Sequence, residues 1–444
     1  MSRSYYHSVT LDKDKCVGCT NCLKRCPTEA IRIRAGRARI IDELCIDCGE
    51  CIRVCQHHAK VAVTDPFESI RRFKYRVALP APALYGQFKT LESIAVLASA
   101  LRHIGFDEVF DVARGAELVS RAVQKRLADR DCPRPLISSA CPAVVRLIQV
   151  RFPELIDNIV DVRSPMEVAA GLARQEFCKR FGADPEEVGC FFITPCAAKV
   201  TAIRKPIGHT QTQLNGAISM MEIYGLLSVQ MKKETAAAIE SMQPPTGWGL
   251  GWARSGGECK ALDSEEALAV DGIDDVNRVL EAIENDRLPN LRFFEGQACD
   301  EGCVGGPIAF ENPFIARNRI RQLSLTEKSD VSLAEAVTDR DLAQVGHMLR
   351  FDAEIQSVDS LRIDTDLKQA LAKMQRIEEI RKKLPGLDCG SCGAPSCRAF
   401  AEDVVRGFAQ EGDCIFRMRE ELEEFESGEM KSFVPLPFRK EDHS

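Results

Sequence analysis

Two cysteines in a glycine-rich loop constrain this chain more than any other feature. Cys299 and Cys303 lie in the segment from Phe293 to Pro307, just after a short apolar run. Two thiols separated by three residues can form a redox pair or half of a metal site, and the glycines let the backbone approach a bulky ligand closely. Either interpretation requires partner residues elsewhere in the chain.

Two upstream segments have the same construction and supply candidate partners. Cys141 follows a short β-type apolar run that begins near Arg134, and Cys196 follows a similar run that begins at Gly189. Open α/β sheets place their ligand sites just beyond the carboxyl ends of the strands. We therefore expect an α/β domain in which Cys141, Cys196 and the two loop cysteines lie close together.

These segments carry a family resemblance. The motifs S-S-A-C-P, T-P-C-x-x-K and E-x-x-x-C-x-x-G-C-x-G-G-P, in this order, resemble the three signature segments of FeFe hydrogenases, over residues 1 to about 335. The resemblance implies an H-cluster, a 4Fe-4S unit joined to a diiron subsite with CO, CN and azadithiolate ligands. Four ordinary buried thiols in an α/β core are the alternative. On the resemblance the ligands are Cys141, Cys196, Cys299 and Cys303, the last of which also bridges to the diiron subsite.

The resemblance also implies the walls of the cofactor pocket. Pro82 and Ala83 match loop positions near the diiron cyanides, and Pro195 and Lys199 match the opposite wall, while Ala140 directly precedes the first cluster ligand. An ammonium beside an electron-rich cluster would supply a charge-assisted hydrogen bond. The alternative for Lys199 is an ordinary solvated lysine after a strand.

Departures from the family pattern predict slow catalysis. Rapid members carry a proton-relaying cysteine where this chain has Ala140, and two further relay positions fall on Val160 and Ala202. Alanine and valine carry no exchangeable proton, so the usual relay is interrupted. Methionines that line the pocket in the family are replaced by Thr194 and Gln297.

A substitute proton route is predicted near a second glycine-rich segment. Glu258 and Cys259 follow a Gly-Gly step in residues 247–259, which resemble a segment near the diiron pocket. A carboxylate buried beside an electron-rich cluster has its charged form disfavoured, which raises its pKa. We propose Glu258 as a carrier, with Cys259 as a second station and Glu295 as a rival; the alternative is a surface glutamate and a structural thiol.

The N-terminal region contains an internal repeat of two cysteine runs. Each run has the spacing C-x-x-C-x-x-C-x-x-x-C, and a basic, β-prone spacer at Ile31 to Ile41 separates them. This is the pattern of two-cluster ferredoxins, in which three cysteines of one run join the last cysteine of the other; zinc sites use paired cysteines instead. Cluster one would use Cys16, Cys19, Cys22 and Cys55, and cluster two Cys45, Cys48, Cys51 and Cys26.

A second cysteine group lies near the C-terminus, after a predicted helix at Asp366 to Lys383 that Pro385-Gly386 ends. It resembles the four-cysteine cluster domain of Rnf-type electron-transfer subunits and corrinoid iron-sulfur proteins. We expect a further 4Fe-4S site, with zinc as the alternative, and an acidic helix at Phe416 to Ser427. The ligands would be Cys389, Cys392, Cys397 and Cys414.

Composition sets outer bounds on function. The 20 cysteines cluster as C-x-x-C groups, and no N-terminal segment reads as a signal peptide, so we expect iron-sulfur ligation in a reducing, cytoplasmic setting. No apolar run approaches the ~18 to 20 residues of a membrane helix. The net charge of −7 argues against general nucleic-acid binding. Cys132, Cys178 and Cys190 have no motif partners and are expected to be core or incidental thiols.

The combined prediction is a multi-cluster hydrogenase of the sensory type, exchanging electrons with ferredoxin or another redox or signalling protein; a homodimer is left open. Some sensory members carry a PAS domain, for which we expect no room before Ser444. The alternatives are a metabolic or electron-bifurcating catalytic subunit, and a non-catalytic iron-sulfur assembly or electron-transfer protein. The expected domains are a small α+β ferredoxin-like domain at 1–75, an α/β H-cluster domain at 76–335, a helical linker at 336–384, a small helical 4Fe-4S domain at 385–415 and a tail at 416–444.

Overall fold

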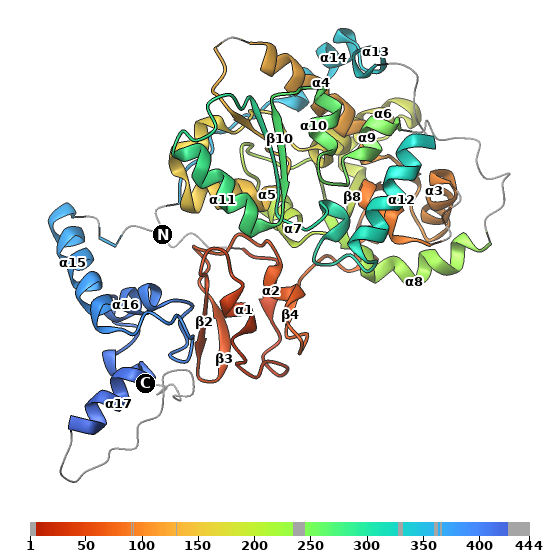
Figure 1. The fold of residues 1–444 in the computed structure, drawn as a ribbon. Helices are drawn as coiled ribbons and strands as arrows, with labels where there is room; N and C mark the ends of the chain where they lie inside the picture. The colour runs from red at the N-terminus through yellow and green to blue at the C-terminus, as the bar shows by residue number, and fades with distance from the viewer. Residues whose placement is uncertain are drawn as a thin grey trace. The chain divides into compact units, whose positions relative to one another are not determined.

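The computed structural model describes residues 6–89, 91, 93–129, 131–233, 245–326, 332–358, 363–364 and 366–424 (Figure 1). The chain forms two compact units. The smaller contains residues 1–45, 49–62 and 358–444, and the larger contains residues 46–48 and 63–357. The boundary after residue 357 falls inside the predicted helical linker.

A four-stranded parallel sheet forms one part of the larger unit. All seven residues of its central strand β8 (Val188–Thr194) are buried, as expected for a parallel strand covered on both faces. Strand β5 (Tyr75–Pro80) runs into a 3-10 helix, η2 (Pro82–Gln87). The order is β6 (Glu108–Val109), β5 (Tyr75–Pro80), β8 and β9 (Gly216–Ser219).

A second parallel sheet has three strands in the order β10 (Ala267–Asp271), β11 (Phe293–Gln297) and β7 (Leu136–Ile137). In the register between β11 and β7, Phe293 pairs with Leu136 and Phe294 with Ile137, and all four side chains are buried. The loops that carry Cys141 and Cys299 therefore leave neighbouring parallel strands at the same edge.

Helices surround these sheets (Figure 1) and begin at side-chain caps in several places. The Asp111 side chain accepts a hydrogen bond from the Ala113 N–H, which is 2.8 Å away and lies in the first turn of α4. The helices are α3 (Ile94–His103), α4 (Val112–Ala128), α5 (Pro142–Arg151), α6 (Pro165–Phe181), α7 (Ala197–Arg204), α8 (Met220–Met231), α9 (Gly247–Gly251), α10 (Gly257–Leu262), α11 (Ile273–Glu284), α12 (Pro313–Thr326), α13 (Leu333–Ala336) and α14 (Asp339–Leu349).

The N-terminal part of the smaller unit repeats one motif twice. Each half has a short helix that begins after a residue with positive φ, Thr20 at 64° before α1 and Gly49 at 77° before α2. The basic spacer forms an antiparallel hairpin, as its β-prone residues predict. The elements are β1 (Val9–Leu11), α1 (Asn21–Lys24), β2 (Ile31–Arg34), β3 (Arg37–Ile40), α2 (Glu50–Arg53) and β4 (Lys60–Ala62), with β1 antiparallel to β4.

The C-terminal part of the smaller unit packs its own apolar core. The predicted helix is confirmed as α15 (Leu367–Lys383), and it buries Ile377 and Ile380 against Phe400 of α16 (Cys397–Val405). The acidic helix forms as α17 (Ile415–Glu424), and its predicted extension to Ser427 lies outside the described residues.

Hydrogen bonds and buried ion pairs join this C-terminal part to the hairpin of the N-terminal part. The Ile33 N–H donates to the Gly393 carbonyl at 2.9 Å. The Asp403 carboxylate accepts hydrogen bonds from Arg32 at 2.6 Å and from Arg34 at 2.8 Å, and the side chains of all three residues are at most 13% exposed. The two cysteine-rich segments therefore fold as one compact unit.

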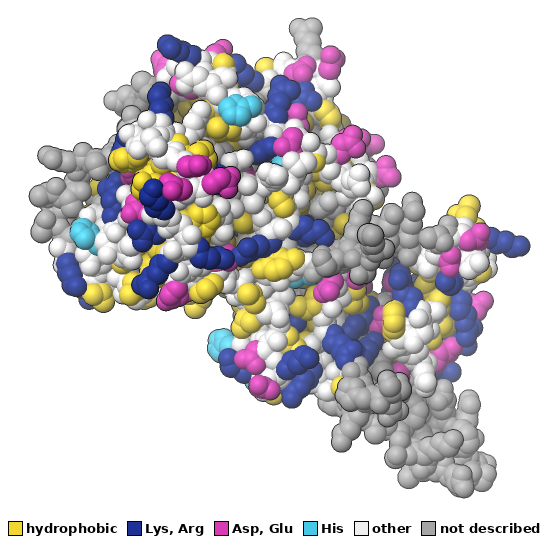
Figure 2. Space-filling model, turned by 180° about the vertical axis from the view of Figure 1, so that it is seen from behind, with side chains coloured by type: hydrophobic (Ala, Val, Ile, Leu, Met, Phe, Trp, Pro, Cys, Tyr) yellow, Lys and Arg dark blue, Asp and Glu magenta, His cyan; other side chains and the backbone are white. Residues whose placement is uncertain are grey.

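The surface carries mixed charge. On the face shown in Figure 2, Lys and Arg side chains are interspersed with Asp and Glu side chains over both units. Among the residues that the structure describes, no helix combines the length and apolar character that crossing a lipid bilayer requires.

Candidate active site

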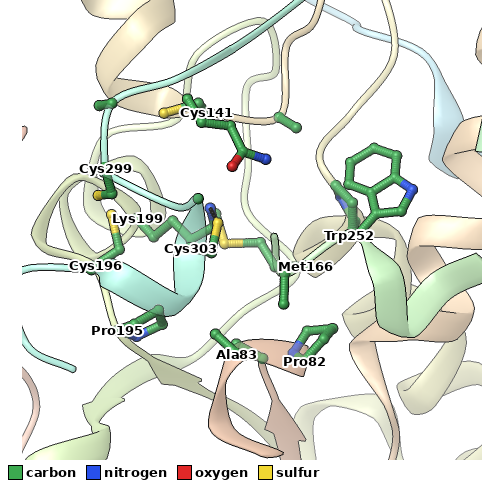
Figure 3. Close-up of a pocket in the computed structure, with 18 of the residues that line it drawn as sticks. Pro82, Ala83, Cys141, Met166, Pro195, Cys196, Lys199, Trp252, Cys299 and Cys303 are labelled. Atoms are coloured by element: carbon green, nitrogen blue, oxygen red, sulfur yellow. Dashed lines mark hydrogen bonds between the residues drawn. The ribbon is translucent and has the colours of Figure 1, made fainter. Parts of the chain in front are cut away.

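Five cysteines line one cavity of about 70 Å³ in the larger unit. Four of them come from the three predicted loops (Figure 3), and the fifth is Cys48 of the second ferredoxin-type run. Cys141 and Cys196 occupy the N-cap positions of α5 and α7, just beyond β7 and β8. Cys299 follows β11, and Cys303 begins the 3-10 helix η6 (Cys303–Gly305). The sequence prediction that these residues lie together beyond the carboxyl ends of parallel strands agrees with this geometry.

Two glycines of the third motif allow its loop to approach its neighbours closely. A Cβ at Gly306 would lie 2.3 Å from the Pro195 carbonyl oxygen, and one at Gly302 would lie 2.3 Å from Gln297 Oε1. Gly302 also has a φ of 88°, which side chains other than glycine rarely adopt. Gly306 therefore lets this loop lie against the loop that carries Cys196, and Gly302 lets it pack closely against Gln297.

Lys199 supplies a buried positive charge at the thiols. Its Nζ lies 3.9 Å from Cys303 Sγ, and Figure 3 shows the side chain reaching toward that cysteine. Burial alone would lower the pKa of Lys199, but the neighbouring charges of Cys303, Cys196 and Cys141 more than offset this, so the pKa lies above its ordinary value. Burial raises the pKa of Cys196 to about 11, and Lys199 opposes that change. A cluster bound by these cysteines as thiolates would therefore lie beside the Lys199 cation, which compensates its negative charge.

Small and apolar side chains form most of the remaining wall. Pro82, Ala83, Ala140 and Pro195 all line the cavity, as the sequence resemblance predicts. Ala140 ends in a methyl group, so no proton donor stands directly before Cys141.

Glu258 lies in the same cavity wall and is buried, at 2% exposed. Ser138 Oγ donates a hydrogen bond to Glu258 Oε2 at 2.5 Å. Burial raises the pKa of Glu258 well above its usual value, and the nearby Glu295 carboxylate raises it further. A carboxyl group held neutral by its surroundings can give up a proton when a partner accepts one.

Glu295 also lines the cavity, but hydrogen bonds hold its carboxylate from several sides. It accepts from the N–H groups of Gly256 at 3.0 Å and Cys259 at 2.7 Å, and from the side-chain amide of Gln297 at 3.1 Å. Burial raises the pKa of Glu295, and the hydrogen bonds from Cys259 and Gly256 act against the rise. The structure thus places both carboxyl candidates at one wall.

Other predicted positions lie away from the cavity lining. Cys259 follows Glu258 on α10, but it is not among the residues that line the cavity; burial and the Glu295 charge raise the pKa of its thiol. Val160, Ala202 and Thr194 are buried, and they do not line the cavity either.

Three residues that line the cavity were not predicted from the sequence to have a role. Ser138 belongs to the first cysteine motif, and its hydroxyl positions Glu258. Met166 and Trp252 reach the cavity from α6 and from the end of α9 (Figure 3), and Trp252 Nε1 donates to Ser120 Oγ at 2.8 Å. Met166 follows the Ser164-Pro165 pair and could have been singled out as a replacement pocket methionine.

The smaller unit assembles two further cysteine groups as the motifs predict. Cys16, Cys19, Cys22 and Cys55 line one cavity. Around Cys392, burial raises the thiol pKa to about 11, and the charges of its three motif partners add to the rise, so the four lie within electrostatic reach of one another. Those partners are Cys389, Cys397 and Cys414.

The remaining cysteines are those of the second ferredoxin-type group and those without motif partners. Cys51 lies on α2, and Cys26 Sγ accepts a hydrogen bond from the Ala30 N–H at 3.2 Å; the grouping of Cys26 and Cys51 with Cys45 and Cys48 stays a prediction. Cys190 and Cys132 are buried in the core of the larger unit, and Cys178 packs against it.

The donor sets fit iron-sulfur ligation. Thiolate groups are the protein ligands of such clusters, and each group here combines three closely spaced cysteines with a distant fourth, or four cysteines from three loops. At the largest site, Lys199 is buried against the thiols. This is the arrangement expected for a site that holds a negatively charged cluster.

The curated relatives have low sequence identity to this chain, and the chain spans less than two thirds of the length of each of the two described here. The "NADP-reducing hydrogenase subunit HndD" of Solidesulfovibrio fructosivorans is 25% identical over 233 residues, covering 45% of this chain and 40% of the relative. "Iron hydrogenase 1" of Clostridium pasteurianum is 24% identical over 368 residues, covering 67% of this chain and 64% of the relative. A solved structure of a variant of the [FeFe]-hydrogenase HydA1 from Chlamydomonas reinhardtii aligns with a TM-score of 0.49 at 18% identity, covering 66% of this chain and 96% of that one.

Family models divide the chain as the motifs do. A 4Fe-4S dicluster domain matches residues 8–56, and an Fe-S cluster family matches residues 384–416. The model described as "Iron only hydrogenase large subunit, C-terminal domain" matches residues 74–307, more than half of the chain, including Cys141, Cys196, Cys299 and Cys303. The chain therefore belongs to the iron-only hydrogenase large-subunit family.

Proposed function

We propose that this chain is an FeFe hydrogenase that oxidises dihydrogen and reduces protons slowly, and that it serves in hydrogen sensing or redox regulation. The observation that supports this most is the convergence of four cysteines on one cavity beside the buried ammonium of Lys199. The proposed ligands are Cys141, Cys196, Cys299 and Cys303.

The protein's own groups would serve three tasks at this site. The H-cluster, when bound, supplies the metal centre at which dihydrogen is split heterolytically. Lys199 would donate a charge-assisted hydrogen bond to the anionic ligands of the diiron subsite. Pro82, Ala83 and Pro195 would shape a dry wall, and Glu258 would move protons between the cavity and its Ser138 partner.

Slow turnover follows from the residue at position 140, because a methyl group cannot relay a proton. Replacing Ala140 with cysteine should raise the rate of hydrogen oxidation at least ~10-fold, since one positioned proton-transfer group contributes roughly 10²–10⁴-fold. The full gain is not expected while Val160 and Ala202 leave the rest of the usual relay interrupted. Hydrogen-dependent dye reduction measures the rate.

The same assay tests the proposed slow turnover. A wild-type rate equal to that of rapid metabolic hydrogenases would rule out the sensory interpretation. It would favour a metabolic or electron-bifurcating catalytic subunit instead. An unchanged rate in Ala140→Cys, with a fully loaded cofactor, would show that proton transfer at this position does not limit turnover.

Glu258→Gln tests the substitute proton route. Glutamine keeps the shape but cannot release a proton, so hydrogen oxidation should fall by about 10²-fold, and the pH dependence that the raised pKa of Glu258 produces should disappear. The control is Glu266→Gln, which removes an exposed carboxylate of the same unit and should leave the rate unchanged. Unchanged oxidation in Glu258→Gln, with intact infrared bands, would transfer the role to Glu295.

Electrons would travel one at a time through the remaining clusters. All the proposed ligands of the first ferredoxin-type cluster and of the C-terminal cluster lie in one compact unit, which supports a shared route to a ferredoxin or another redox or signalling partner in a reducing, cytoplasmic setting. The extra C-terminal cluster, together with the interrupted relay, supports the sensory assignment.

A further inference from the structure

Lys60 is a buried lysine whose amine has no hydrogen-bond partner among the described residues. It begins β4 and is only 2% exposed, and its Nζ is shielded from solvent. An isolated ammonium in an apolar interior is strongly disfavoured unless negative charge compensates it. The position therefore requires an anionic neighbour.

The cavity that Lys60 lines offers one kind of anion. Its polar lining includes Cys16, Cys19, Cys22 and Cys55, and its apolar lining includes Leu11, Ile33 and Ala38. Burial raises the pKa of Cys22 to about 11, and Lys60 is the main influence that opposes this rise. Four thiolates that share an iron-sulfur cluster carry net negative charge, and reduction adds one more unit of it.

The internal repeat supplies a comparison within the same molecule. Cys26 and Cys55 end the two cysteine runs, and each sulfur accepts a hydrogen bond at 3.2 Å from the N–H four residues later, that of Ala30 or Ala59. The next residue is Ile31 in the first half and Lys60 in the second.

Ile31 and Lys60 are each 2% exposed. An isoleucine therefore meets the packing needs of this place in one half of the repeat. The lysine in the other half adds a charge that the packing does not require.

We propose that the Lys60 ammonium holds the reduction potential of the cluster bound by Cys16, Cys19, Cys22 and Cys55 above that of the other ferredoxin-type cluster, assigned to Cys45, Cys48, Cys51 and Cys26. A positive charge close to the cluster in a buried setting stabilises the reduced, more negative state, with little screening by solvent. An electron that enters this pair of clusters therefore resides first on the cluster beside Lys60. The inference rests on the proposed function only in requiring that these four cysteines bind a cluster.

Lys60→Ile gives the second half the residue of the first. In a redox titration of the full-length, cluster-loaded protein followed by electron paramagnetic resonance, one cubane signal should become at least tenfold harder to reduce, a downward shift of 59 mV or more for one electron. The other signals should stay in place. Lys15→Gln is the matched control, because Lys15 adjoins Cys16 but its side chain is 57% exposed; its removal should cause a much smaller shift.

The reciprocal variant keeps the proposal testable if Lys60→Ile fails to assemble its cluster. Ile31→Lys places an ammonium beside the other cluster and should raise that cluster's potential by a similar factor. A fully loaded Lys60→Ile protein with every potential unchanged, or a loaded Ile31→Lys protein with no upward shift, overturns the proposal. If Cys22→Ser leaves every cubane signal unaltered, including the one that Lys60→Ile shifts, the cluster assignment itself is overturned, which is a separate failure.

Discussion

Replacing Asp403 with alanine is expected to destabilise the C-terminal part of the smaller unit by about 3–5 kcal/mol, the usual cost of removing one partner from a buried ion pair. Arg32 and Arg34 both donate to this carboxylate, and their side chains are 9% and 13% exposed. Without Asp403, two guanidinium groups would remain buried beside each other with no compensating charge from that residue. Hydrogen exchange of peptides covering α16, measured on the full-length protein, gives the free energy of local opening.

The neighbouring residue provides the control. Glu402 pairs with Arg398 on the outer face of the same helix, where the two side chains are 31% and 73% exposed. Glu402→Ala should cost no more than about 0.5 kcal/mol, as for other surface pairs one helical turn apart. Equal effects of the two substitutions on the free energy of local opening would mean that the buried charges of Asp403, Arg32 and Arg34 do not stabilise the contact between the two cysteine-rich segments.

Lys199→Met should lower hydrogen oxidation by about 10²–10³-fold, the range found when a preorganised donor to developing charge is removed. Methionine matches the length and apolar stem of lysine, so the cavity keeps its packing and loses its cation. The buried ammonium near Cys303 would no longer compensate the anionic cofactor, and we expect weaker retention of the diiron subsite as well. Dye reduction and iron content, measured on the same preparations, separate lost turnover from lost cofactor.

A surface lysine shows whether the effect belongs to the cavity. Lys74 pairs with Glu187, and its side chain is 59% exposed, so Lys74→Met should leave both readouts unchanged. Wild-type activity and iron content in Lys199→Met would remove Lys199 from the proposed site.

The cysteine groups were predictable from the sequence because their information is local. Each ligand loop joins a short apolar strand to a turn rich in proline or glycine, and the strand ends place the thiols without knowledge of distant contacts. The repeated spacing of the N-terminal runs similarly indicated which cysteines lie together, and Cys16, Cys19, Cys22 and Cys55 do line one cavity.

Contacts between distant segments were not predictable in this way. The hydrogen bond from Ser138 to Glu258 spans 120 positions, and the bond from Arg32 to Asp403 spans 371. The sequence around each of these four residues contains no pattern that indicates its hydrogen-bond partner. One sequence alone therefore identified Glu258 as a candidate but could not identify the hydroxyl that holds it.

The helical pattern of α15 shows a related limit. Its apolar positions continue along one stripe, yet Leu371 and Met374 are each 53% exposed while Ile377 and Ile380 are buried. The buried pair lies where α15 packs against the core that Phe400 and Cys414 help to form. Periodicity indicated the helix correctly, but the length of the covering element decides which part of the stripe is buried.

The most direct test of the central claim is infrared spectroscopy of the protein after cofactor loading. Bands from bound carbon monoxide and cyanide arise only when a diiron subsite is present, so the account predicts these bands in the wild-type protein and their loss in Cys303→Ser, with the electron paramagnetic resonance signals of the other clusters retained. Complete iron-sulfur loading with no such bands in the wild-type protein would contradict the hydrogenase assignment and favour a non-catalytic iron-sulfur assembly or electron-transfer role.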